Sequence, residues 1–170
     1  MLVQSRRLEP ETEGAVSVDY DEFSGEYLLR ASHVPARGPG GLVVINVYTS
    51  SSNLNSATIS FSTFYRRPYL LDCDFVSVMI DGDVQNLTDG DYSCDNVDCN
   101  ELFCQTEESR SYSVPFSIVE QISMGRTVKF RVCASVVSLS PAAIQTFKGL
   151  VLQRDKIFSV IQQDYQNLQE

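Results

Sequence analysis

The sequence predicts an α+β protein with a mostly antiparallel, β-sandwich-like core of about seven or eight strands. A short helix is expected near residues 118–124 and a C-terminal helix from residue 141. The strands are predicted because apolar residues alternate with Ser, Thr and charged residues in several short segments. The terminal helix is predicted by Ser140-Pro141, a favourable helix start, followed by apolar residues spaced three, four and seven apart.

Strands joined by turns account for the segment from residue 15 to residue 80. The expected elements are a hairpin over 15–31, a loop rich in Pro and Gly over 35–41, and strands over 42–48, 57–62 and 73–80. Asp81-Gly82 is a strong signal for a two-residue hairpin turn, so a short strand is expected to return from it.

Residues 86–109 show no strand alternation and hold many acids together with three cysteines. We expect a long acidic loop here, which is uncommon inside a compact domain. A strand over 112–116 follows. Ser117 and Glu120 have the spacing of a capping box, which predicts that the short helix starts there and ends at Gly125. The segment 128–132 alternates most clearly of all, and 136–139 is its expected partner strand.

The terminal helix carries an apolar stripe that only Arg154 interrupts: Ile144, Phe147, Val151, Phe158, Ile161, Tyr165 and Leu168. If it is helical throughout, the segment 141–170 spans about 45 Å. We expect its first half to cover the domain's own core. Phe158, Ile161, Tyr165 and Leu168 are expected to protrude and to bind a partner protein or a second copy of the chain. The alternative is a bend at Gly149 or Arg154-Asp155 that returns the helix to the sheet.

The length of 170 residues fits a single domain. We expect a flexible N-terminal arm over 1–14, where charges, Pro10 and Gly14 show no period. A β-rich domain over 15–155 includes the start of the terminal helix, and 156–170 forms a helical extension.

A series of short motifs occurs in a fixed order along the chain. It consists of Asp21, Phe23 and Gly25 in the first hairpin, a strand near Phe61, Leu71-Asp72-Cys73 before the strand that ends in Asp81-Gly82, the acidic Asp89-Gly90-Asp91, Phe116 with the short helix, the strand 128–132, and Leu139-Ser140. In this order the motifs resemble a group of uncharacterised bacterial β-sandwich domains. The resemblance covers most of residues 15–155 and implies a two-layer β fold with helices at one side, but no activity. The three-cysteine loop and the helix beyond Arg154 depart from that group.

The charge balance excludes some classes of partner. A net charge of -9 argues against nucleic acid, and the basic doublets Arg6-Arg7 and Arg66-Arg67 have too few basic neighbours to form a stripe. No apolar window is long enough for a membrane span, and the N-terminus lacks the apolar core of a signal peptide. We therefore expect a cytoplasmic protein with reduced thiols, or a periplasmic or secreted one if a leader has been omitted.

Cysteines are the first candidate ligands. Cys94, Cys99 and Cys104 are separated by four residues each, and Cys73 or Cys133 would supply a fourth thiolate for tetrahedral zinc. Structural zinc sites usually begin with a closer pair of cysteines, so incidental thiols in a solvated loop are the alternative. A disulfide within 94–104 is the further alternative for an exported protein.

An aromatic and basic cluster is the second candidate site. Tyr65, Arg66, Arg67 and Tyr69 together offer stacking surfaces and hydrogen-bond donors for an anionic or sugar ligand. The alternative is a strand end at which aromatic rings pack inward and the Arg head groups reach water.

The sequence contains no catalytic constellation. His33 is the single histidine, and no nucleophile or orienting carboxylate is tied to it by a known motif. We expect no enzyme activity and no cofactor. The favoured hypothesis is a protein-interaction or self-association module that uses the terminal helix. The alternative is a small-ligand or metal-binding protein that uses the acidic cysteine loop 86–109.

Overall fold

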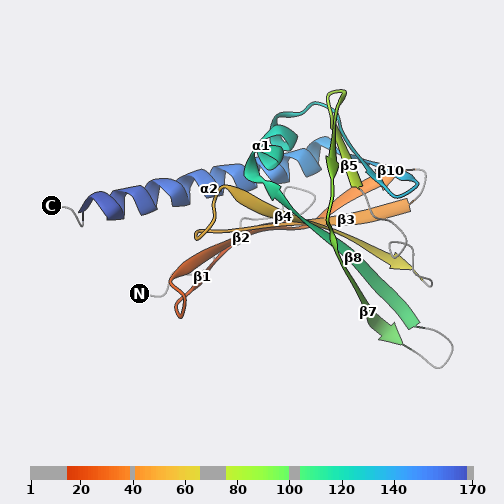
Figure 1. Cartoon of the computed structure of the whole chain (residues 1–170), viewed down its shortest axis with the longest axis horizontal. Helices are drawn as coiled ribbons and strands as arrows, with labels where there is room; N and C mark the ends of the chain where they lie inside the picture. Colours follow the sequence, from red (N-terminus) through yellow and green to blue (C-terminus); the bar gives the residue numbers. More distant parts are fainter. Residues whose placement is uncertain (1–14, 39–40, 66–75, 100–103, 168–170) are drawn as a thin grey trace.

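The computed structural model describes residues 15–38, 41–65, 76–99 and 104–167. In this part of the chain, ten strands form one antiparallel sheet, accompanied by two helices (Figure 1). The elements are β1 (Ala15–Asp21), β2 (Glu26–Gly38), β3 (Gly41–Ser50), β4 (Ser56–Tyr65), β5 (Val76–Ile80), β6 (Asp83–Leu87), β7 (Asp91–Cys99), β8 (Cys104–Pro115), α1 (Phe116–Met124), β9 (Val128–Val132), β10 (Ser135–Leu139) and α2 (Pro141–Asn167). The predicted α+β class, the short helix and the terminal helix from residue 141 are confirmed.

The strand order is β6-β5-β9-β10-β2-β3-β4-β8-β7. The long strand β2 has two neighbours on one side, since β1 pairs with its first half and β10 with its end. The sheet curls strongly. Phe61 of β4 and Phe130 of β9 are in edge-to-face contact, with their ring centres 5.2 Å apart, although three strands separate β4 from β9 in the sheet. The core therefore lies inside the curl of a single sheet, as in half of a barrel.

The two helices cover the open side of this curl. Helix α2 packs along β2, and α1 packs against α2 (Figure 1). Phe116 and Ile122 of α1 and Phe147 and Leu150 of α2 are all almost completely buried. Their apolar faces complete the core that the strands begin, which is the usual way for a one-sided sheet to shield its apolar face.

The turn at Asp81-Gly82 is confirmed. Asp81 has φ 50° and Gly82 has φ 103°, and β5 and β6 pair directly on either side of them. Two positive φ values at the central residues are typical of the hairpin turn that matches the twist of the flanking strands.

The predicted loop over 35–41 is largely wrong, because β2 continues to Gly38 and pairs with β3 throughout that stretch. A β-bulge between Ala31 and Val34 shifts the register, and His33 within it has φ 57°. The His33 backbone N–H donates to Asn46 Oδ1 at 2.8 Å, which satisfies the donor freed by the bulge. Pro35 follows this bulge directly. Positions at bulges are among the few in a sheet that tolerate proline, which has no backbone N–H to donate.

The predicted acidic loop over 86–109 is also wrong. Most of this segment belongs to β7 and β8, which pair from Asp91↔Ser111 to Cys99↔Cys104, with a shift of register between Asn96 and Asp98. Apolar alternation is missing because β7 is an edge strand whose described side chains, residues 91–95, are mostly exposed, so polar residues are tolerated on both of its faces.

The predicted capping box at Ser117 and Glu120 is wrong as well. Helix α1 begins at Phe116 after Pro115, and no side chain caps its start. Glu120 instead forms an ion pair with Arg154 of α2.

Candidate functional site

The terminal helix starts as its sequence predicts. The Ala143 backbone N–H donates to Ser140 Oγ at 3.0 Å, and Pro141 is the first helical residue. Ser140 thus satisfies one of the N–H groups that a helix leaves without a partner in its first turn. From there the side of α2 that carries Ala143, Phe147 and Leu150 is buried against the domain.

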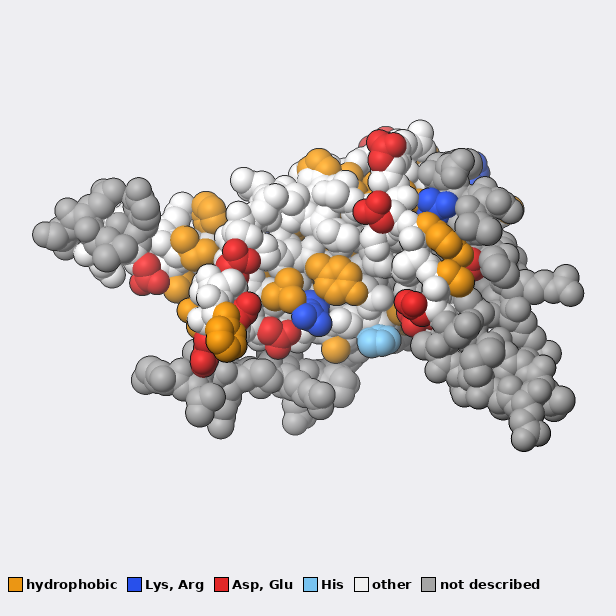
Figure 2. Space-filling view, turned by 60° about the horizontal axis from the view of Figure 1, so that its bottom comes forward, with side chains coloured by type: hydrophobic (Ala, Val, Ile, Leu, Met, Phe, Trp, Pro, Cys, Tyr) orange, Lys and Arg blue, Asp and Glu red, His pale blue; other side chains and the backbone are white. Residues whose placement is uncertain are grey.

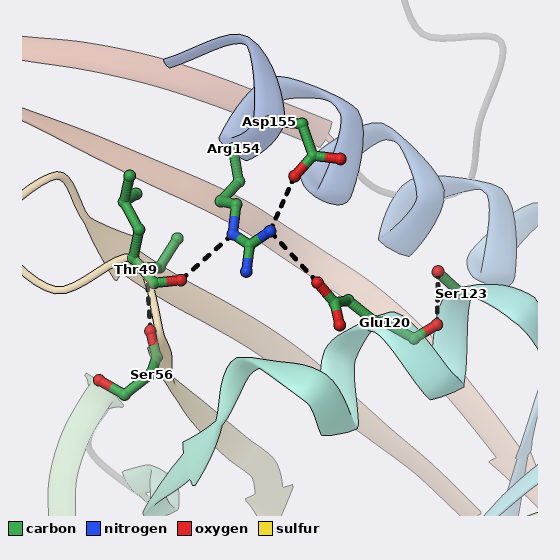
Figure 3. Close-up of polar contacts among 7 residues, drawn as sticks. Thr49, Ser56, Glu120, Ser123, Arg154 and Asp155 are labelled. Carbon is green, nitrogen blue, oxygen red and sulfur yellow. Dashed lines mark hydrogen bonds and ion pairs between the residues drawn. The ribbon is translucent and has the colours of Figure 1, made fainter. Parts of the chain in front are cut away.

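Arg154 fixes α2 at the place where it leaves the domain (Figure 3). Its Nε donates to the Leu54 carbonyl at 3.2 Å, and an Nη atom lies 3.2 Å from Glu120 Oε1 and 2.8 Å from Asp155 Oδ1. The side chain is 18% exposed, so these contacts are partly shielded from water. The arginine that interrupts the apolar stripe is therefore the residue that joins α2 to α1 and to the β3–β4 turn.

Beyond this point α2 continues as one helix past the sheet (Figure 1). Ile157 is the last buried side chain, and every side chain described after it is exposed. Phe158 is 46% exposed and Ile161 is 38% exposed. Figure 2 shows hydrophobic side chains at this end of the molecule. The observed path differs from the alternative in which the helix folds back onto the sheet.

Several predicted site residues lie outside the part of the structure that is described. These are the side chains of Tyr165 and Tyr65, and the residues Leu168, Arg66, Arg67 and Tyr69. The aromatic and basic cluster, and the last two members of the helical stripe, stay predictions.

The three cysteines of the predicted metal site lie on one hairpin. Cys94 is an exposed free thiol on β7, while Cys99 ends β7 opposite Cys104 at the start of β8. The side chains of Cys99 and Cys104 are outside the described set. Among the described side chains, no group of three or more His, Cys, Asp or Glu residues is placed to hold a metal ion.

Cys133 is disulfide-bonded, so the expectation of reduced thiols is wrong for this residue. It lies in the turn between β9 and β10, with φ 55°. An odd count of five cysteines does not report on which of them the fold brings together.

Sequence reasoning missed a polar cluster on the β7–β8 hairpin. The Tyr92 hydroxyl donates to Glu108 Oε1 at 2.8 Å, and Glu108 is fully buried. The Arg110 guanidinium lies 5.4 Å from the centre of the Tyr92 ring and donates to the Gly90 carbonyl at 3.2 Å. Burial and the Glu108 carboxylate both raise the pKa of Tyr92. The phenol therefore stays a proton donor at neutral pH, and the cluster holds the hairpin together.

No family model matches the chain, and no curated protein and no solved structure matches it. The resemblance to bacterial β-sandwich domains therefore stays a prediction. In the described ranges, neither helix combines the length and the apolar character needed to cross a bilayer.

Proposed function

We propose that the protein is a non-enzymatic self-association module in which the projecting end of α2, residues 158–167, binds the same segment of a second copy. The observation that carries the proposal is the continuation of one apolar face. Phe147, Leu150 and Ile157 are buried on the domain, and Ile161, which is 38% exposed, follows them at helical spacing. An apolar helix face that runs past its own domain needs another surface to exclude water from it.

The charge of the segment favours a second copy as the occupant. The whole chain carries a net charge of -9, so two copies repel each other over most of their surfaces. Residues 158–167 contain a single charged residue, Asp164, so the net charge of the segment is only -1. Two copies can meet through this weakly charged segment with little of that repulsion. A symmetric pair also uses each exposed side chain twice, which doubles the apolar area buried.

The test compares oligomeric state by sedimentation velocity across a range of concentrations. We expect the unmodified protein to dimerise, and the double variant Phe158→Ser, Ile161→Ser to remain monomeric at concentrations at least about tenfold higher, given about 1.4 kcal/mol per decade. Val160→Ser is the matched control, because Val160 is also 46% exposed but lies about 200° around the helix from Phe158.

Either of two results would contradict the proposal. The first is a monomeric unmodified protein at every concentration, which would leave the helix end for a different partner protein. The second is equal loss of the dimer in the Val160→Ser control, which would show that the buried face is not the one assigned.

A further inference from the structure

A hollow of about 380 Å³ lies on the outer face of the sheet, across β5, β6, β9 and β10. Its lining residues occupy the strand positions that alternate with buried Val78, Phe130 and Val137, so they face away from the core. The volume is within the usual range for small-molecule sites. The hollow is separate from the polar cluster of β7–β8 and from the projecting end of α2.

Two cations stand side by side in this hollow. Lys129 and Arg131 are both exposed and two residues apart on β9, which places them about 6.6 Å apart along the strand. Neither forms an ion pair with any residue that the structure describes. The described residues that line the hollow include no acid. Two adjacent cations with no counter-charge among the described residues, on a chain of net charge -9, form a local field that attracts an anion.

The register brings a third cation to the same face. Lys129 pairs with Ser138 of β10, and Ser138 pairs with Arg37 of β2. Arg37 is exposed and follows the buried Ala36, so it shares the outer face with Lys129. Two strand spacings separate these cations, about 9.6 Å. Arg37 extends the positive field past the rim of the hollow.

Apolar surface surrounds the cations. Met79 lies directly opposite Lys129, and Val136 lies directly opposite Arg131. Val84, opposite Met79 on β6, is 61% exposed, and Val136 is 39% exposed. These side chains offer contact to a hydrocarbon body close to the charged groups. At the other end of the Arg131 row, Ser77 Oγ donates to Asn86 Oδ1 at 2.8 Å, which holds the Asn86 amide in place at the rim.

From this arrangement we infer that the hollow binds a small organic anion, in which a carboxylate or phosphate head group is joined to an apolar body. The planar guanidinium of Arg131 matches either head group with two parallel hydrogen bonds, and Lys129 adds a point charge. Met79, Val84 and Val136 cover the apolar body. The site needs no residue of the α2 end, so it stands independently of self-association.

Calorimetric titration of the full chain with octanoate and octyl phosphate tests this site. We expect saturable binding with one ligand per chain, and weaker binding of 1-octanol, acetate and inorganic phosphate. The double variant Lys129→Gln, Arg131→Gln should weaken binding of both amphipathic anions by at least about tenfold, since charge-assisted hydrogen bonds are lost. Lys148→Gln, which removes an exposed cation on α2, is the matched control and should leave affinity unchanged.

Binding of one or both amphipathic anions that depends on Lys129 and Arg131 supports the inference and identifies the preferred head group. No saturable binding of either anion overturns it, and so does unchanged affinity in the double variant. Inorganic phosphate that binds as tightly as octyl phosphate would overturn the role of the apolar wall. Because both cations are exposed, we expect the double variant to fold normally, so a loss of binding reports on the site itself. Far-UV circular dichroism of each variant checks its folding.

Discussion

The guanidinium of Arg154 lies over the ring of Phe116, with its central carbon 4.3 Å from the ring centre. Phe116 is the first residue of α1 and is almost completely buried. This contact, with the hydrogen bond to Leu54, ties α2 to α1 and to the β3–β4 turn at one point. The last buried side chain of α2, Ile157, comes one helical turn later. Arg154 therefore marks the boundary between the docked and the projecting parts of the helix.

We expect Arg154→Met to lower the free energy of unfolding by about 1–3 kcal/mol, since the ring contact and a charged hydrogen bond are lost. Methionine keeps much of the aliphatic packing. Lys156→Met makes the same change at an exposed cation of α2 and should stay within about 0.5 kcal/mol of the unmodified protein. Urea denaturation measures all variants. Equal effects at the two positions would show that Arg154 does not anchor the helix.

Since Arg154 separates the docked from the projecting part of α2, replacing phenylalanine by alanine should affect stability differently on its two sides. Phe147→Ala should cost about 3–5 kcal/mol, because it leaves a cavity in the core. Phe158→Ala should change the unfolding free energy of the monomer by no more than about 0.5 kcal/mol, because this ring is already half exposed. Denaturation at low protein concentration keeps self-association out of the comparison. A large loss at Phe158 would mean that the helix end packs on its own domain.

Alternation and cap signals were enough to predict much of the fold. The strand around Phe130 has one buried and one exposed face, and the strand around Val78 has one buried and one half-buried face, so period-two patterning reports both directly. The turn at Asp81 and the cap at Ser140 depend on local residue preferences, which the sequence also shows.

Features that depend on tertiary context could not be predicted. Strands β7 and β8 near Tyr92 carry polar residues on both faces, so their pairing is invisible to hydrophobic periodicity. The contact between Phe61 and Phe130 depends on how far the sheet curls. The hollow around Arg131 is lined by residues of four strands. Which of these residues lie side by side depends on the strand order and the pairing register, which the sequence alone does not show.

A pH-dependent contribution to stability is expected from Asp81. Its carboxylate accepts the backbone N–H of Thr127 at 2.8 Å and that of Arg126 at 3.0 Å, and these bonds hold its pKa below the ordinary value. A carboxyl group with a lowered folded-state pKa stabilises the protein above its unfolded-state pKa, which is about 3.9 for Asp. That contribution is lost as pH falls through the lower, folded-state value.

Asp81→Asn removes the charge and keeps a residue that tolerates the observed φ of 50°. We expect a lower melting temperature than that of the unmodified protein at about pH 7, and a smaller difference at about pH 3. Thermal unfolding followed by circular dichroism at several pH values measures this. Two curves that stay parallel over the whole range would show that ionised Asp81 does not stabilise the turn.

Replacing glycine by alanine should change the free energy of unfolding in opposite directions at Gly90 and Gly149. A Cβ added at Gly90 would lie 2.5 Å from Cε1 of Tyr112, a fully buried ring packed against Phe61, so Gly90→Ala should cost about 1–3 kcal/mol. A Cβ added at Gly149 would meet Val16 at 3.3 Å. Val16 is only partly buried and belongs to the outlying strand β1, so it has room to shift by a few tenths of an ångström.

Gly149→Ala should therefore stabilise the protein by up to about 1 kcal/mol, the difference in helix propensity between the two residues. Urea denaturation of both variants measures the two signs under the same conditions. A stabilising Gly90→Ala would mean that the hairpin does not close on the Tyr112 ring as described. A clearly destabilising Gly149→Ala would show instead that β1 is held rigidly against α2.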